Sequence, residues 1–332
     1  MATSYPDRTN ARGIWKLDDI TKNIKTEGTW PRGATRGIYN QGGAHPAFSD
    51  VMEYITIETL GNGTDFGNLT SGKNQNAGVS SATRGIFGGG YAQPAAVNVI
   101  EHLTIMTTGN NSDFGDLTQA RRGLGANSND TRGLFAGGEP STTNIIDYIT
   151  MASTGNAIDF GDLTVTGMGF QNSVCCSKTR AVFTGSNTPD HSQNAIGFVQ
   201  FSTTGNAVDF GDQSQGRTQP AGACSHTRGI FAGGNDPSGV VNIIDYVTIA
   251  SHGDATDFGD LVSATHAQHP GGACNLTRGV FARQQSQVLD YITIATLGDL
   301  GDAADFGDIM PSSGYSQGSG LSNGHGGLAL TS

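Results

Sequence analysis

The chain has 332 residues, 50 of them glycine, and 14% of its residues are charged, against about 25% in an average globular protein. Its net charge is −11 and its basic residues form no cluster, so we expect no nucleic-acid partner. No apolar run approaches the roughly 20 residues of a membrane span, which argues against membrane insertion. Low charge argues against disorder, and the polar first ten residues lack the apolar core of a signal peptide. We therefore expect a soluble protein made in a cytoplasm.

The first 34 residues differ from the rest of the chain, and both tryptophans lie among them. Between the tryptophans, three apolar residues are spaced for one face of a helix: Leu17, Ile20 and Ile24. Aspartates begin this stretch and lysines end it, an order that suits the helix dipole. We expect residues 1–34 to contain a short helix that either caps the main domain or anchors it to a larger assembly.

From residue 35 onward, one repeat occurs six times. Thr-Arg begins at 35, 83, 131, 179, 227 and 277, and Asp-Phe-Gly begins at 65, 113, 159, 209, 257 and 305, so one unit spans 46 to 50 residues. The unit at 121–164 predicts four strands: Gly123–Ser128, Arg132–Gly137, Asn144–Ala152 and a short one around Asp159–Leu163. The third is apolar on both faces, as a strand covered on both sides requires. Such repeats indicate an all-β propeller.

The first repeat lacks a first strand, because Trp30-Pro31 stands there and proline fits a strand interior badly. A stretch that could replace this strand, Gly318–Asn323, occurs near the C-terminus. We expect it to pair with Arg36–Asn40, which would close a six-bladed propeller over residues 35–332 and remove its open edges. The alternative is a seven-bladed propeller in which Gly326–Leu330 supplies another second strand.

The order of motifs in one unit, RGLG, RGLFAGG, IDY and DFGDL, resembles the kelch repeat. The shared features are the Gly-Gly that ends the second strand, the tyrosine of the third strand and the unit length, over roughly residues 35 to 310. Kelch repeats usually carry a tryptophan before the fourth strand, where this chain has phenylalanine. An aromatic residue that can pack between blades is thereby retained. The resemblance implies the propeller fold but no particular biological role.

Each repeat carries one arginine and one Asp-Phe-Gly aspartate at fixed positions, which indicates a structural role for both. The third strand offers a second set of acids, but the fourth repeat has Gly197 at that position. We therefore predict that the arginines pair with the Asp-Phe-Gly aspartates: Arg36, Arg84, Arg132, Arg180, Arg228 and Arg278 with Asp65, Asp113, Asp159, Asp209, Asp257 and Asp305. The carboxylates of Asp-Phe-Gly-Asp match no recognised calcium loop, and aspartates that cap turns explain them.

Neither a catalytic nor a metal-binding pattern can be identified. The eight histidines fall at unrelated repeat positions, and no serine–histidine–aspartate pattern or glutamate pair is recognisable. Cys176, Cys224 and Cys274 occupy a position that holds Ser80 and Ser128 in other repeats, so we expect buried free thiols. Zinc-ligand spacings are absent. We expect no catalytic residue, no cofactor and no metal.

The loops at the two ends of the predicted propeller differ in variability. Those after the first and third strands keep nearly the same sequence, whereas those after the second strand range from GEPSTT (138–143) to GSNTPDHSQ (185–193). Surface loops can drift without a function, but drift should affect both ends equally. We expect the variable loops to bind a partner through the following residues: His45, Phe48, Tyr91, Pro94, Pro189, His191 and Asp236.

The wording of the repeats, such as TRGIFAGG and IDYVTIA, together with the ending SNGHGGL, resembles structural proteins of tailed bacteriophages, especially phages of marine bacteria. The resemblance implies a non-enzymatic virion protein of the tail, baseplate, fibre or capsid surface, made in the host cytoplasm and acting in assembly or adhesion. Its partners would be other virion proteins, a host-surface glycan or protein, and further copies of itself. The alternative is a cellular kelch-type protein-binding module, while the missing catalytic pattern disfavours a propeller enzyme or glycan hydrolase.

Overall fold

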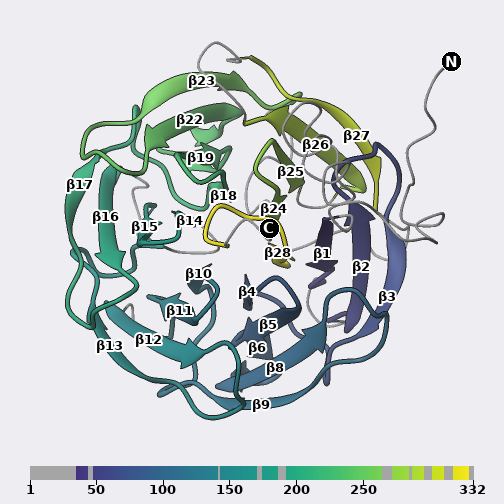
Figure 1. The fold of residues 1–332 in the computed structure, drawn as a ribbon. Helices are drawn as coiled ribbons and strands as arrows, with labels where there is room; N and C mark the ends of the chain where they lie inside the picture. Colours follow the sequence, from purple (N-terminus) through teal and green to yellow (C-terminus); the bar gives the residue numbers. More distant parts are fainter. Residues whose placement is uncertain are drawn as a thin grey trace, which may run out of the picture.

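The computed structural model describes residues 35–43, 48–140, 143–169, 174–185, 192–263, 271–283, 286–294, 301–309 and 317–328. The strands form six four-stranded antiparallel sheets around a central axis, so the protein is a six-bladed β-propeller (Figure 1). The described residues contain no helix, and therefore none that is long and apolar enough to cross a membrane. The short helix expected within residues 1–34 lies outside the described residues.

Each blade runs outward from the axis, with its first strand innermost. Blade 1 contains β28 (Gly320–Ser322), β1 (Arg36–Asn40), β2 (Val51–Thr56) and β3 (Thr64–Asn68). Blade 2 contains β4 (Ala77–Ser80), β5 (Arg84–Gly88), β8 (Val99–Thr104) and β9 (Ser112–Asp116). Blade 3 contains β10 (Gly125–Ser128), β11 (Arg132–Ala136), β12 (Ile145–Thr150) and β13 (Ile158–Asp162).

Blade 4 contains β14 (Val174–Cys176), β15 (Arg180–Phe183), β16 (Ala195–Gln200) and β17 (Val208–Asp212). Blade 5 contains β18 (Ala221–Cys224), β19 (Arg228–Ala232), β22 (Ile243–Thr248) and β23 (Thr256–Asp260). Blade 6 contains β24 (Gly271–Cys274), β25 (Arg278–Ala282), β26 (Val288–Thr293) and β27 (Ala304–Asp308). Two loops carry small ribbons, β6 (Tyr91–Ala92) with β7 (Ala95–Ala96), and β20 (Asn235–Asp236) with β21 (Gly239–Val240).

The C-terminal strand closes the ring, which confirms the expected pairing. β28 runs antiparallel to β1, with Leu321 opposite Ile38 and Ser322 opposite Gly37. Residues 323–328 form turns and bends rather than a strand, and six four-stranded sheets account for the blades among the described residues. The seven-bladed alternative is therefore wrong. The segment after β28 instead lies near the centre of the ring (Figure 1).

The innermost strands are built from small residues because the blades approach one another closely at the axis. A Cβ atom on Gly272 of β24 would lie 2.1 Å from the carbonyl oxygen of Gly222 in β18. One on Gly320 of β28 would lie 2.4 Å from the carbonyl oxygen of Gly272. Such contacts leave no room for a side chain. Part of the high glycine content therefore follows from the packing of six blades around one axis.

An aromatic pair between the third and fourth strands stabilises the blades. In blade 3, the buried ring of Phe160 meets Tyr148 edge to face, with 6.0 Å between the ring centroids. Blade 4 repeats the contact with Phe198 and Phe210, and blade 2 with His102 and Phe114. Edge-to-face pairs of this kind stabilise by about 0.5–1.5 kcal/mol beyond the burial of their surface. The Asp-Phe-Gly phenylalanine thus serves the core in each blade.

Candidate functional site

Strand direction divides the loops between two ends of the ring. The loops after the second strands and the connections between blades lie at one end, which we name the variable face. The turns between first and second strands and between third and fourth strands lie at the other end, the fixed face. On the variable face, isolated β-bridges join a connection between blades to a loop of the following blade, as in Asn74 with Tyr91 and Arg122 with Glu139.

The structure places the residues predicted to bind a partner in three different ways. His45, Pro189 and His191 lie outside the described residues. Phe48, Tyr91 and Pro94 lie together on the variable face, and Pro94 is exposed. Asp236 lies in a separate loop of blade 5, in the ribbon of β20 and β21.

Phe48 and Tyr91 form the centre of a mixed aromatic and charged patch. Their rings meet edge to face with 5.6 Å between centroids, although Phe48 belongs to blade 1 and Tyr91 to blade 2. The guanidinium of Arg122, from the connection to blade 3, stacks 4.8 Å from the centroid of the Tyr91 ring. Arg122 also forms an ion pair of 3.0 Å with Glu139, and both side chains are partly exposed. Three successive blades therefore contribute to one accessible patch.

Asp236 shapes its own loop rather than facing outward. Its side chain is buried, and its Oδ1 atom accepts the backbone N–H groups of Ser238 at 2.7 Å and Gly239 at 2.9 Å. Its other carboxylate oxygen accepts a hydrogen bond from the side chain of Gln215. These bonds are those of an aspartate that caps a turn. The carboxylate is thus occupied within the loop.

The predicted pairing of the repeat arginines with the Asp-Phe-Gly aspartates is wrong. The aspartates are exposed on the outermost strands, as Asp159 is on β13. The arginine Nη1 atoms instead donate to a carbonyl of the following blade: Arg36 to Ile105, Arg84 to Met151, Arg132 to Phe201, Arg180 to Ile249, Arg228 to Ile294 and Arg278 to Ile57. The guanidinium also lies over an aromatic ring of its own blade, for example Tyr148 beneath Arg132 at 4.9 Å. The arginines thus join each blade to the next, including blade 6 to blade 1.

The acids of the third strands, which we did not select, form the buried ion pairs. Asp147 lies 2.6 Å from Arg121, and Asp245 lies 2.9 Å from Arg217, with all four side chains almost completely buried. Blade 2 pairs Glu101 with Lys73, blade 6 pairs Asp290 with Arg283, and in blade 1 Gln41 donates to Glu53. Burial lowers the pKa of Arg121 and Arg217, while the partner carboxylate opposes this effect.

Blade 4 shows why sequence reasoning missed these pairs. It has Gly197 in place of the acid and Met168 in place of Arg121, and a Cβ on Gly197 would lie 3.1 Å from the Met168 sulfur. Acid and base are therefore absent together. This joint absence could have revealed the pairing from the sequence. It was hard to see because the base lies in a different segment from the acid, and because the base is lysine in one blade and arginine in others.

Six small polar side chains form a ring where the innermost strands end on the fixed face: Ser322, Ser80, Ser128, Cys176, Cys224 and Cys274. Five of them donate to the backbone carbonyl of the neighbouring blade, as Ser128 does to Ser80 at 2.8 Å and Ser322 to Cys274 at 2.6 Å. All four cysteines are buried and free, as expected. A cavity of about 60 Å³ lies on the axis beside the ring.

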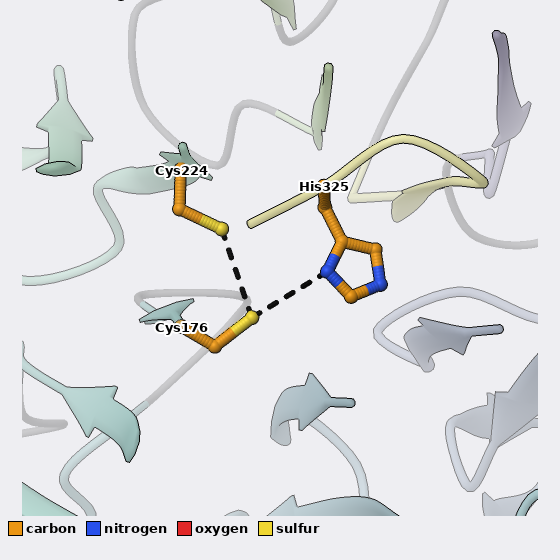
Figure 2. A group of neighbouring side chains, drawn as sticks. All are labelled: Cys176, Cys224 and His325. Atoms are coloured by element: carbon orange, nitrogen blue, oxygen red, sulfur yellow. Dashed lines mark hydrogen bonds between the residues drawn. The ribbon is translucent and has the colours of Figure 1, made fainter. Parts of the chain in front are cut away.

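Cys224 departs from this pattern, and His325 lies beside it. The Cys224 sulfur lies 3.6 Å from the Cys176 sulfur, which in turn lies 3.5 Å from Nδ1 of His325 (Figure 2). Hydrogen bonds from Cys176 and Cys274 lower the pKa of the Cys224 thiol well below its usual value, against the opposing effect of burial. The contact with Cys224, together with burial, raises the pKa of Cys176. His325 belongs to no repeat, so repeat-based reasoning could not place it at the axis.

Comparison with known proteins adds no relative to this picture: no family model matches the chain, and no curated protein matches it. The resemblances to kelch repeats and to phage structural proteins therefore rest on the motifs of the chain. What is shown is a six-bladed β-propeller with four-stranded blades, two unlike ends and a polar cluster on its axis.

Proposed function

We propose that this protein is a non-enzymatic structural component of a bacteriophage virion that contacts its partner through the variable face. The observation that carries the proposal is the patch of Phe48, Tyr91 and Arg122, which three successive blades build together. Aromatic residues and arginine are the residue types enriched where proteins bind one another. The kelch-like motifs and the resemblance of the repeat sequences to phage structural proteins support the same proposal.

The axial cavity is too small for a typical small-molecule substrate. Its volume of about 60 Å³ is far below the roughly 300–1,000 Å³ typical of small-molecule sites. On the variable face, by contrast, Pro94 and Glu139 lie around an aromatic pair that remains partly accessible. A patch that mixes aromatic and charged side chains suits a neighbouring virion protein, and a tyrosine ring also suits a sugar of the host surface.

The test is a double substitution, Phe48→Ala with Tyr91→Ala, introduced into the phage that encodes the chain. We expect the variant protein to fold, to be lost from purified particles or to leave them defective in attachment, and to keep its thermal stability. The matched control is Leu60→Ala, which removes a side chain that is 57% exposed in a turn of the fixed face. Normal incorporation and attachment of the double variant would contradict the role of the patch.

The proposed location has its own test. We expect the protein to be present at constant stoichiometry in purified particles analysed by mass spectrometry. A protein found free in the infected cell and bound to a cellular protein would instead favour the kelch-type binding module.

A further inference from the structure

Three side chains with metal-binding atoms meet at the axis, and they come from three different segments of the chain. Cys176 ends β14 of blade 4, Cys224 ends β18 of blade 5, and His325 lies in the segment that follows β28. One potential ligand atom from each lies within 4.8 Å of the other two. Figure 2 shows the Cys224 sulfur and the His325 ring both turned toward the Cys176 sulfur. All three side chains are buried, so solvent is largely excluded from the cluster.

The tautomer of His325 leaves Nδ1 as the ring nitrogen that can bind an ion. Its Nε2 atom lies 3.1 Å from the carbonyl oxygen of Ser80, which can only accept a hydrogen bond, so Nε2 carries the proton. Nδ1 then has the lone pair and lies 3.5 Å from the Cys176 sulfur. This lone pair accepts the backbone N–H of Gly327 at 3.1 Å, a hydrogen bond that an ion bound at Nδ1 would replace. A carbonyl that fixes the far nitrogen of a histidine is the usual support of a metal-binding imidazole.

Cys224 is arranged differently from the other residues of the ring, whereas Cys176 and Cys274 donate to the neighbouring carbonyl as the serines do. The hydroxyls of Ser80, Ser128 and Ser322 donate to the neighbouring carbonyl and thereby serve the backbone. Cys224 makes no such bond to the Cys176 carbonyl in the described structure and turns its sulfur toward the Cys176 sulfur. Any small polar side chain at this position could donate to the neighbouring carbonyl, so the repeat structure alone does not explain why the Cys224 sulfur points toward the Cys176 sulfur.

Two of the three separations among these atoms match those around a tetrahedral ion, and the third, between the Cys224 sulfur and Nδ1 of His325, is no more than 4.8 Å. With Zn–S of about 2.3 Å and Zn–N of about 2.0–2.1 Å, tetrahedral angles separate two sulfurs by about 3.8 Å and a sulfur from a nitrogen by about 3.6 Å. The observed separations are 3.6 Å between the two sulfurs and 3.5 Å between the Cys176 sulfur and Nδ1. Two thiolates and an imidazole also form the ligand type that thiophilic ions prefer.

We propose that Cys176, Cys224 and His325 bind one Zn²⁺ ion, which ties the C-terminal segment to blades 4 and 5. A water molecule completes the coordination, because the Cys274 sulfur is not part of the group of three and instead accepts the backbone N–H of Cys224 at 3.2 Å. Binding as thiolates releases the thiol protons of Cys176 and Cys224 to solvent. The ion would reinforce the closure of the ring, since the segment that carries His325 directly follows the closing strand β28.

The experiment uses the full chain, reduced and stripped of metal, titrated with Zn²⁺ against a chromophoric chelator. We expect one equivalent to bind, and Co²⁺ in its place to give the absorption bands of a tetrahedral ion with thiolate ligands. Cys176→Ser, Cys224→Ser and His325→Asn should each weaken binding by more than the roughly 10–100-fold that loss of an outer-shell partner causes. The two serine variants should fold, because serine already occupies this ring position in three blades.

The matched control is Cys175→Ala. Cys175 is buried in the same strand, but its sulfur faces Gly229 and lies 2.2 Å from where a Cβ on that glycine would be. We expect this variant to bind Zn²⁺ as the unchanged chain does. Binding that survives in Cys176→Ser and Cys224→Ser, or no stoichiometric binding to the reduced chain, would overturn the proposal. So would binding of Cu⁺ without binding of Zn²⁺, since the distances were matched to a tetrahedral ion.

Discussion

The fixed face and the variable face join the same six blades by different means. On the fixed face, a backbone contact recurs: the turn after each third strand docks against the Asp-Phe-Gly strand of the preceding blade, as Gly205 N–H does by donating to Phe160 at 2.8 Å. On the variable face, buried side chains take this role and change from blade to blade, from Asp147 with Arg121 to Gly197 with Met168. The fixed-face turns need glycine where an added Cβ would meet the next blade, as at Gly161, whereas the buried pairs of the variable face can be exchanged together.

The comparison changes how loop variability should be interpreted. The Thr-Gly-Asn turns stay constant because they hold the neighbouring blade, for example through Asn156, whose Oδ1 accepts the backbone N–H of Asp116 at 3.0 Å. The contrast between constant and variable loops therefore follows from folding and does not by itself identify a binding surface. The composition and accessibility of the Phe48 and Tyr91 patch carry that argument instead.

The largest effect is expected on the variable face, from Asp147→Ala. The substitution leaves the buried guanidinium of Arg121 without its carboxylate, and breaking one side of a buried pair costs about 3–5 kcal/mol. Urea unfolding would measure the loss. The double variant Arg121→Met with Asp147→Gly copies blade 4 and should lose less than the single variant. If the double variant loses as much unfolding free energy as the single variant, the Gly197 and Met168 pair of blade 4 cannot replace the ion pair of blade 3.

A smaller effect is expected on the fixed face, from Gly161→Ala. Gly161 has a φ of +146°, and an added Cβ would lie 2.5 Å from the carbonyl oxygen of Gly205 in the next blade. Unfavourable backbone conformations of this kind cost about 1–3 kcal/mol, and displacing the neighbouring turn adds to that cost. Gly155→Ala is the control, because Gly155 has a φ of +154° with open space around it. Equal losses of unfolding free energy in the two variants would show that contact between blades adds nothing.

The sequence predicted the parts of this fold that repeat. Six units, four strands in each, the closing pair of Gly318–Asn323 with Arg36–Asn40 and the buried thiols all follow from periodicity and strand patterns. The partners of the repeat arginines could not be found in this way, because a backbone carbonyl leaves no trace in the sequence. His325 was missed because it has no repeat equivalent, and only the closed ring brings it 3.5 Å from Cys176.

A third prediction concerns a single hydrogen bond of the fixed face. Asn156→Ala removes the acceptor of the Asp116 backbone N–H, and we expect a loss of about 0.5–1.5 kcal/mol in unfolding free energy. Asn156→Asp is the control, because Asp254 fills the same role in blade 5 by accepting the Asp212 N–H at 3.0 Å. An aspartate variant as unstable as the alanine variant would contradict the interchange of the two residues at this position.

The smallest expected effect is a pH dependence confined to blade 6. Burial raises the pKa of Asp290 to about 6, while Arg283 opposes this shift and Asp305 adds to it. Arg283 Nε lies 3.3 Å from the carboxylate, and Val262 stands where Thr118 donates its hydroxyl to Asp147 in blade 3. Asp290 is therefore the most weakly stabilised of the third-strand aspartates.

The sign of the pH effect follows from this raised pKa. An unfolded aspartate titrates near about 3.9, so between about pH 4 and pH 6 the folded chain binds more protons at Asp290 than the unfolded chain does. The contribution of Asp290 to stability is therefore present at low pH and is lost as the pH rises through about 6.

We expect Asp290→Asn to gain stability relative to the unchanged chain between pH 4 and pH 7, measured as the difference between their melting temperatures. Asp147→Asn is the matched comparison in blade 3, where a close arginine and a hydroxyl bond the carboxylate, and it should destabilise at neutral pH. A difference for Asp290→Asn that does not change with pH would show that Arg283 compensates fully for burial.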